Sequence, residues 1–200
     1  MPFVFLDPGP LIDAELQLIP PAAHWMNEIL RSCEHPLTKR DAASEAAVNR
    51  EKILEFLRAA PGGRQPGDAS TGRVPAYHFW MLVNPSVGEP PIQIAGGLGL
   101  RIGNHPEIEL YSGNIGYHVY PAARGRHLSE RSCRLVFPLA RRHGMEQLWI
   151  TCNPDNHASR RTCERLGGKL VEIVTLPRNH SFRARGETEK CRFLFDLTRI

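Results

Sequence analysis

The spacing of apolar positions in the first sixty residues changes from strand-like to helix-like. Leu16 and Leu18 alternate with polar residues, which predicts a short strand over Ala14–Ile19 that ends at two prolines. After the prolines, apolar side chains recur every three or four residues, as on one face of a helix. They are Trp25, Met26, Ile29, Leu30 and Cys33 in a first helix, and Ile53, Leu54 and Leu57 in a second.

The middle of the chain predicts a run of antiparallel strands. Tyr77–Val83 and Gln93–Ile102 read as two paired strands, and a long strand over Glu107–Tyr120 follows, with a break at Ser112-Gly113 left open. The second of these strands contains three glycines, which indicate either a bulge or a close approach of backbone or ligand. These glycines are Gly96, Gly97 and Gly99.

The last seventy residues predict two helices among three short strands. The helix Leu128–His143 ends at Gly144, a residue suited to a helix C-terminus. The strand Leu148–Cys152 and the helix Asn156–Leu166 follow. Two strands then form a closing antiparallel pair, with a polar connection between them. These strands are Lys169–Leu176 and Cys191–Leu197.

The length of 200 residues is enough for one domain with a full core. We expect the core over residues 15–198, with residues 1–13 and the turn-rich loop 61–75 at the periphery. No apolar run is long enough to span a bilayer, and the N-terminus lacks the basic segment of a signal peptide. Five cysteines without a C-x-x-C pair favour reduced thiols in a cytoplasmic protein over a disulfide framework.

Charge and composition argue against two classes of binding site. The net charge of +4 is mild and the arginines are dispersed, so nucleic-acid binding is not indicated. The nine histidines are scattered without the spacing of metal ligands, so we expect no metal site. Most arginines read as solvated surface residues. Arg124 and Arg126 are exceptions because they lie in a turn between a predicted strand and a predicted helix.

That turn is the most informative stretch of the chain. Residues Ile115–Ser129 run from a β segment through Arg124-Gly125-Arg126 into the helix that begins near Leu128. Such a turn presents backbone N–H groups at a helix N-terminus, which suits a phosphate or pyrophosphate. A second strand-to-helix turn, Asn153–Ser159, follows about thirty residues later. Together the two turns predict one extended anionic ligand across the end of a sheet.

The same residues resemble the acetyl-CoA-binding half of the GNAT superfamily of N-acetyltransferases. The family's pyrophosphate turn reads Q/R-x-x-G-x-G/A, and here Arg124 fills its first position, while His127 and Ser129 replace the two small residues. Asn156, Ser159 and the terminal glycines 167 and 168 match the downstream helix of the family. An uncharacterised branch of bacterial predicted acetyltransferases is more similar still, in residues 72–80, 115–117 and 151–160. The resemblance spans roughly residues 15–198.

The resemblance implies an α/β (α+β) fold with a mixed, mostly antiparallel central sheet flanked by helices. The strands ending near Tyr120 and Cys152 would splay apart, and acetyl-CoA would enter the gap. A backbone N–H at Val119 would polarise the thioester. The residues implied to bind the cofactor are His118, Val119, Arg124, Gly125, Arg126, His127, Leu128, Ser129, Asn156 and Ser159.

The proton-transfer groups are less well defined by the sequence. Many family members carry a tyrosine where this chain has Cys163, so the thiol is a candidate proton donor, with simple packing as the alternative reading. Tyr117 is the nearest polar candidate for the base on the central strand. Glu109 and Tyr111 could act through water. His118 points to the opposite face of a regular strand, and we read its side chain either as a core histidine or as one that supports the site without touching the substrate.

We therefore expect an acetyl-CoA-dependent N-acetyltransferase that acts on a primary amine of a small molecule or peptide in a ternary complex. A non-catalytic acyl-CoA-binding or sensing module is the alternative. An interaction protein that binds another anionic ligand is a weaker third reading. The expected partners are acetyl-CoA and the amine acceptor, without nucleic acid or membrane, and the formation of a homodimer is left open.

Overall fold

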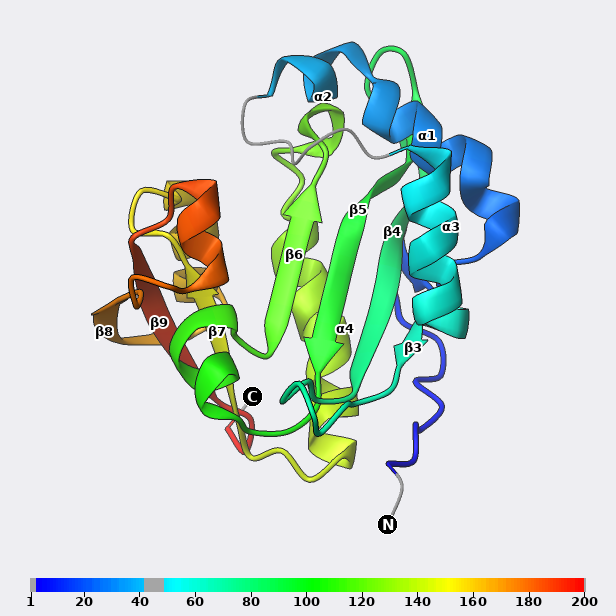
Figure 1. Ribbon diagram of the computed structural model, residues 1–200. Helices are drawn as coiled ribbons and strands as arrows, with labels where there is room; N and C mark the ends of the chain where they lie inside the picture. The colour runs from blue at the N-terminus through cyan, green and yellow to red at the C-terminus, as the bar shows by residue number, and fades with distance from the viewer. Residues whose placement is uncertain (1–2, 42–48, 200) are drawn as a thin grey trace.

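A computed structural model describes residues 3–41 and 49–199 of the chain. Its strands form two antiparallel sheets (Figure 1). The first has the order β1-β2-β4-β5-β6, and β3 pairs with β4 at its side. The second has the order β7-β9-β8. The strands are β1 (Ile12–Asp13), β2 (Leu16–Ile19), β3 (Arg64–Gln65), β4 (Ala76–Val87), β5 (Ile92–Arg101), β6 (Ile115–Val119), β7 (Gln147–Cys152), β8 (Lys169–Thr175) and β9 (Glu189–Asp196).

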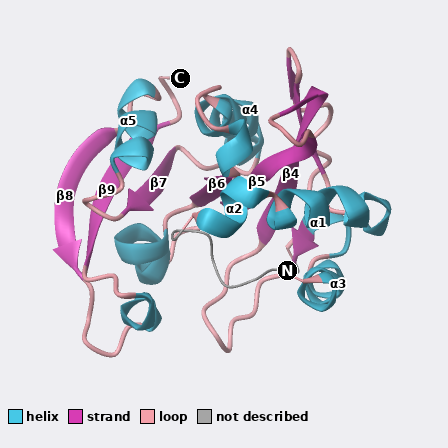
Figure 2. Ribbon diagram, turned by 90° about the horizontal axis from the view of Figure 1, so that it is seen from above, coloured by secondary structure: helices cyan, strands magenta, loops and turns pink. Residues whose placement is uncertain are grey.

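Helices cover both faces of the first sheet (Figure 2). One face carries α1 (Met26–Glu34) and α3 (Arg50–Ala59), whose apolar side chains pack on Trp80 and Ile94, and α2 (Pro36–Arg40) contacts α1. The other face carries α4 (Leu128–Arg142), and α5 (His157–Arg165) packs against the second sheet. The mixed, mostly antiparallel architecture with flanking helices is confirmed.

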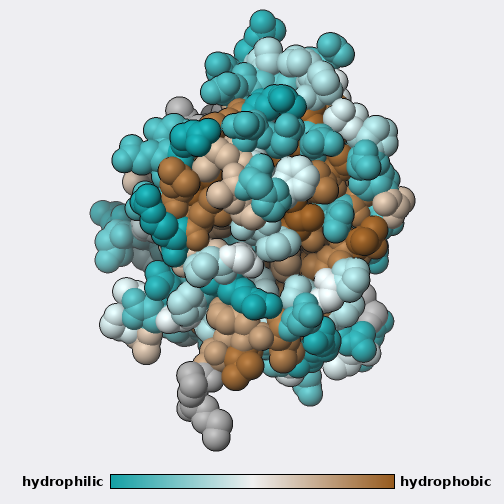
Figure 3. All heavy atoms as spheres, turned by 90° about the vertical axis from the view of Figure 1, so that its right-hand side faces the viewer, coloured by the Kyte–Doolittle hydropathy of each residue, from teal (hydrophilic) through white to brown (hydrophobic). Residues whose placement is uncertain are grey.

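The main core lies between α4 and the inner faces of both sheets. It joins Leu100 of β5, Val136 of α4 and Phe193 of β9, all of which are fully buried. Seen from the side where α3 lies in Figure 1, the surface mixes hydrophilic and hydrophobic side chains (Figure 3). Within the part of the chain that the structure describes, no helix is both long and apolar enough to cross a membrane.

The long strand predicted over Glu107–Tyr120 is wrong in its first half. Ile108–Ser112 forms one π-helical turn, and β6 begins only at Ile115. The His105 carbonyl oxygen accepts the N–H groups of Ile108 and Glu109, which starts the turn, and Gly113 ends it with φ +67°. The alternation of apolar and polar residues in this segment imitates a strand, but these end contacts favour a helical turn.

Smaller differences occur near the N-terminus and in the loop 61–75. Ala14 has φ +50° and lies in the turn that joins β1 to β2, so the predicted strand begins at Leu16 instead. The loop contains β3, which pairs with Ala76 and Tyr77 of β4. The short helix α2 was not predicted, because five residues are too few to show a helical period.

Candidate functional site

A buried asparagine joins the two sheets at the base of the gap between β6 and β7. The Asn114 N–H donates to the Trp149 carbonyl oxygen at 2.6 Å, and the Trp149 N–H donates to Asn114 Oδ1 at 2.8 Å. The Asn114 side chain is completely buried and also donates through Nδ2 to the carbonyl oxygens of Arg101 and Gly103. Beyond this point β6 and β7 belong to different sheets. The predicted splay of the central strands is thereby confirmed.

Hydrogen bonds to β5 occupy alternate peptide groups of β6. The Tyr120 N–H donates to the Ala95 carbonyl oxygen at 2.8 Å, in line with the register of the two strands. In an antiparallel pair, peptide groups that bond to the neighbouring strand alternate with groups that face the other way. The N–H groups of Tyr117 and Val119 therefore point away from β5 and into the gap.

The turn between β6 and α4 presents the start of the helix to the gap. After a 3-10 turn over Pro121–Ala123, Gly125 takes φ +83° and His127 takes φ +56°. His127 is the N-cap of α4, and it makes no side-chain capping hydrogen bond to the described backbone. The first N–H groups of α4 are thus left for another acceptor, and the helix dipole favours an anion there.

His127 stands at a position where the family has a small residue, and the structure explains that preference. A left-handed backbone is uncommon for a residue with a Cβ atom, whereas glycine adopts it without a steric cost. The His127 side chain is 58% exposed and its Nδ1 lies 3.7 Å from Glu130 Oε2. The imidazole is therefore largely exposed to solvent beside Glu130, at the border of the groove.

All ten predicted cofactor-binding residues line one groove of about 1770 Å³. They are His118, Val119, the six residues of the turn Arg124–Ser129, and Asn156 with Ser159. Tyr117 lines the same groove, whereas Cys163 has no exposed surface. The structure thus brings together residues from β6, α4 and α5, and their contact with a cofactor stays a prediction.

The arginines expected to attract phosphate have carboxylate partners instead. Arg124 forms an ion pair with Asp41 and donates through Nε to the Val119 carbonyl oxygen at 3.2 Å. Arg126 Nη2 lies 3.2 Å from Glu15 Oε1. Hydrogen bonds from Arg131, and then from the Glu15 backbone and Arg126, lower the pKa of Glu15 to about 2. The attraction for an anion at this turn therefore comes mainly from backbone N–H groups.

The second turn uses its polar side chain to cap its own helix. Asn156 Oδ1 accepts the Ser159 N–H at 3.0 Å, which makes Asn156 the N-cap of α5. The Ser159 hydroxyl is free to turn toward β6, where its Oγ lies 2.9 Å from the Tyr117 hydroxyl. The second turn thus contacts the central strand through a side chain.

Burial changes the protonation of both candidate catalytic residues. Burial raises the pKa of Tyr117 far above its ordinary value, and nearby cysteines raise it further. The phenol therefore keeps its proton, as a donor must before the reaction, and it is not the base suggested by the sequence. Burial also raises the pKa of the Cys163 thiol to about 12. A fully buried thiol of this kind agrees best with the packing reading.

The core reading of His118 is wrong. The side chain does point away from Tyr117, as strand alternation predicts, but it is exposed and borders the groove. Phe56 of α3, His78 of β4 and Lys190 of β9 also line the groove and were not predicted as site residues. The alternation of β4 could have placed His78 on this face, but only the packed structure shows which part of the face is left uncovered.

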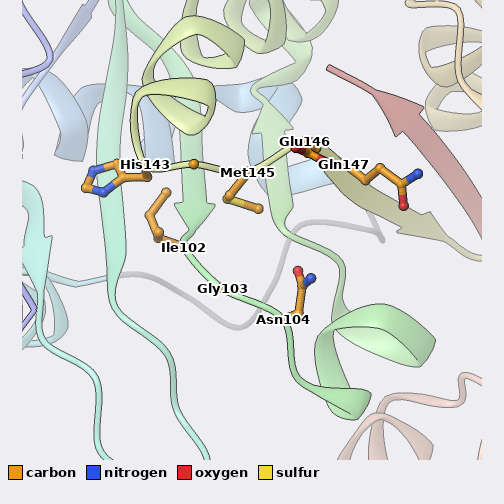
Figure 4. A pocket seen from close by; sticks show the side chains of 8 residues that line it. Ile102, Gly103, Asn104, His143, Met145, Glu146 and Gln147 are labelled. Carbon is orange, nitrogen blue, oxygen red and sulfur yellow. The ribbon is translucent and has the colours of Figure 1, made fainter. Parts of the chain in front are cut away.

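A smaller hollow of about 470 Å³ lies at the other end of α4 (Figure 4). It is lined by Ile102–Asn104 after β5 and by residues 143–147 after α4. Within residues 3–41 and 49–199, no group of three or more His, Cys, Asp or Glu side chains is placed to hold a metal ion. The groove between β6 and β7 is therefore the better candidate for the chemistry.

Comparisons with known proteins agree with this geometry. A family model described as "Acetyltransferase (GNAT) domain" matches residues 18–169. A comparison with curated protein sequences gives no match.

Several solved structures have the same fold. The microcin C7 self-immunity acetyltransferase MccE, in complex with acetyl-CoA and AMP, has a TM-score of 0.65 at 16% identity over 92% of this chain and 93% of its own. A GCN5-related N-acetyltransferase from Brucella melitensis has a TM-score of 0.66 at 16% identity over 98% and 82%. RimL, a ribosomal L7/L12 α-N-protein acetyltransferase in complex with coenzyme A, has a TM-score of 0.63 at 14% identity over 92% and 96%.

Proposed function

The chain belongs to the GNAT acetyltransferase family, and on this premise we propose that it transfers the acetyl group of acetyl-CoA directly to a primary amine. It is an acyltransferase, and acetyl-CoA is its co-substrate. The chain, residues 1–200, acts as one acetyltransferase domain with its core over about residues 15–198. The observation that carries the proposal is the groove in which the uncapped start of α4 and the Val119 N–H face the same space.

The cofactor is held mainly by backbone groups. The N–H groups of the turn Arg124–Ser129 and of the first turn of α4 bind the pyrophosphate, helped by the helix dipole. The pantetheine arm then extends along the gap beside β6, where the peptide groups of Tyr117 and Val119 face it. This mode needs no particular side chain, so it tolerates His127 and the carboxylate partners of Arg124 and Arg126.

The acetyl transfer then takes place at the middle of β6. The Val119 N–H donates to the thioester oxygen as negative charge develops on it, an effect typically of about 3 kcal/mol for one donor. The amine nitrogen attacks the carbonyl carbon, the C–N bond forms and the C–S bond breaks. Tyr117 donates its proton to the departing thiolate, and Ser159 holds the phenol in place at 2.9 Å.

An amine acceptor is supported by the family and by one structural neighbour. RimL is described as an α-N-protein acetyltransferase, which is an amine-acetylating activity. The acceptor of this chain is a small molecule or a peptide. All five cysteines are free, which supports a location in the reducing cytoplasm.

Titration calorimetry and a thiol-release assay test the proposal. CoA and acetyl-CoA should bind with nearly equal affinity, because most contacts go to parts that the two share. A panel of primary amines should then accelerate thiol release from acetyl-CoA, above a slow hydrolysis without acceptor. A protein that only binds or senses acyl-CoA would release no thiol from acetyl-CoA, either with an amine or without one. Failure of both ligands to bind at millimolar concentration would contradict the assignment of the groove.

A further inference from the structure

Two consecutive side chains of β6 lie on opposite faces of the first sheet. Tyr117 points toward α4 and α5, where its hydroxyl meets Ser159. His118 points to the face of α1 and α3, as its neighbour Tyr120 shows: the Tyr120 hydroxyl lies 3.2 Å from Cys33 Sγ of α1. The His118 and Tyr120 rings meet edge to face, with centroids 5.2 Å apart. The Val119 N–H faces the gap beside both.

The His118 imidazole occupies space that a glycine of β5 leaves open. A Cβ atom added to Gly97 would lie 2.9 Å from His118 Cε1, which is closer than real Cβ contacts. Gly97 does not have a positive φ, so its backbone conformation does not require glycine. Glycine inside a strand costs stability, because the unfolded chain is more flexible. The room for this imidazole therefore accounts for glycine at position 97.

Three glycines lie next to the imidazole on the same face of the sheet, bordered by the side chains of His78 and Arg101. Gly99 of β5 and Gly116 of β6 are direct partners in the register, and both line the groove together with Gly97 and His118. In Figure 1, α3 lies beside β4 and α1 near the upper ends of β4 and β5; among the described residues no helix lies in front of the lower part of β5 and β6, and α4 lies behind it. The groove continues from the gap onto the strip of Gly97, Gly99 and Gly116, where a substrate can approach β6 from the side opposite α4.

We propose that His118 accepts the proton of the acceptor amine, which reaches the thioester across the strip of Gly97, Gly99 and Gly116. The inference rests on the proposed acetyl transfer. The imidazole first takes one proton from the ammonium form of the amine, which frees the nitrogen lone pair. The nitrogen then forms its bond to the carbonyl carbon and loses its second proton to solvent, and the electron pair of the breaking C–S bond leaves with sulfur. Tyr117 supplies the proton to that sulfur from the other face. Base and acid therefore stand on opposite sides of one strand, with Val119 between them.

Other nearby groups fit the role of base less well. Tyr117 is held protonated by burial, as described above. His78 lies over Gly99, but β4 is two strands from β6, about 10 Å at the usual spacing of sheet strands. Burial, and next the positive charge of Arg101, lowers the pKa of His78 to about 4, so its imidazole is a weak base.

Two amines with different basicity give a sharp test. The probes are n-butylamine, which is protonated at neutral pH, and hydroxylamine, which is not. With His118→Gln, turnover of n-butylamine should fall by about 10²-fold or more, the usual contribution of a positioned proton acceptor. Turnover of hydroxylamine above the uncatalysed rate should fall only a few-fold, and the Kd for CoA should stay unchanged. Added imidazole should restore part of the n-butylamine turnover to His118→Gly.

Gly97→Ala and His24→Gln complete the test. The first variant displaces the imidazole without removing it, and we expect about a tenfold loss with n-butylamine and unchanged CoA binding. The second removes an exposed histidine outside the groove and should change nothing. Equal losses of turnover for both amines, or full n-butylamine turnover in His118→Gln, would contradict the role of His118 as base. The proposed acetyl transfer would still stand. If the unsubstituted protein binds acetyl-CoA but acetylates neither amine, the proposed acetyl transfer to amines is contradicted, and the role of His118 is contradicted with it.

Discussion

The two strand-to-helix turns at the groove look alike in sequence, but they differ in whether the N-cap side chain accepts a hydrogen bond from the first N–H groups of the helix. Each follows a strand and opens a helix whose N-terminus borders the groove. At α4 the N-cap is His127, in a left-handed conformation and without a capping side chain. At α5 the N-cap is Asn156, whose amide oxygen already accepts a helix N–H.

This difference indicates which helix end can bind an anion. An N–H that is hydrogen-bonded to its own N-cap gains less from a ligand than one that is not. The pyrophosphate should therefore bind at the start of α4, while α5 contributes the Ser159 hydroxyl that contacts Tyr117. The prediction of one extended anionic ligand across the two turns stays, with its pyrophosphate expected at the start of α4.

Gly125→Pro tests the first turn most severely. Proline fixes φ near −65° and removes an N–H, whereas Gly125 has φ +83°. We expect CoA affinity to fall by about a hundredfold or more, nearly independent of salt, in calorimetry. An unchanged melting temperature would show that the protein is still folded. Wild-type affinity in this variant would mean that the phosphates bind elsewhere.

Tyr117→Phe tests whether the Tyr117 hydroxyl group, which contacts Ser159 of the second turn, is the proton donor. The variant removes the hydroxyl group that donates a proton to the thiolate, so turnover should fall by about 10²-fold with little change in CoA affinity. Cys163→Ala is the matched comparison. Turnover should stay within a few-fold, and the melting temperature should drop slightly because a small cavity forms. A large loss of turnover in Cys163→Ala and a small one in Tyr117→Phe would instead identify the Cys163 thiol as the proton donor.

Asn156→Ala separates helix capping from ligand binding. Loss of the N-cap should lower the free energy of unfolding by about 1 kcal/mol, measured by urea denaturation. CoA affinity should change by less than about threefold, because we assign the pyrophosphate to the other turn. A large loss of CoA affinity with little loss of stability would show that the turn at α5 binds the cofactor as well.

Arg124→Ala should have the smallest effect. The guanidinium is already paired with Asp41, so its charge adds little attraction for a phosphate. We expect a loss of CoA affinity of about threefold at low salt, which disappears as salt is raised. A loss that is large and independent of salt would show that the arginine leaves Asp41 and contacts the phosphate directly.

Local patterns in the sequence were sufficient for most of the fold and for ten residues of β6 and of the two turns that line the groove. The period of apolar residues located the major helices and strands, and glycine and asparagine marked the ends of α4 and α5. The turn at Ile108–Ser112 was missed because five residues fit a strand pattern as well as a helical one. Its helical form depends on the His105 carbonyl oxygen.

The errors at the site depend on residues that are distant in sequence. Arg126 pairs with Glu15, 111 positions earlier in the chain, and no local pattern signals that contact. Strand alternation gave the correct direction for the His118 side chain but not its exposure. Whether a strand face is covered is decided by where α1 and α3 pack, and this follows only from the assembled structure.

The Asn114 side chain fixes how the two sheets are placed relative to one another at the base of the gap between β6 and β7. Through Oδ1 the side chain accepts the peptide N–H of Trp149, and through Nδ2 it donates to the carbonyl oxygens of Arg101, at the end of β5, and of Gly103. One side-chain amide thus connects the two sheets by hydrogen bonds. Aspartate has the same shape but lacks the donor and would bury a charge, and leucine lacks both donor and acceptor. The gap between β6 and β7 is thus held open by a side chain that does not itself line the groove. In hydrogen-exchange measurements, the Trp149 amide should be among the slowest to exchange in the chain.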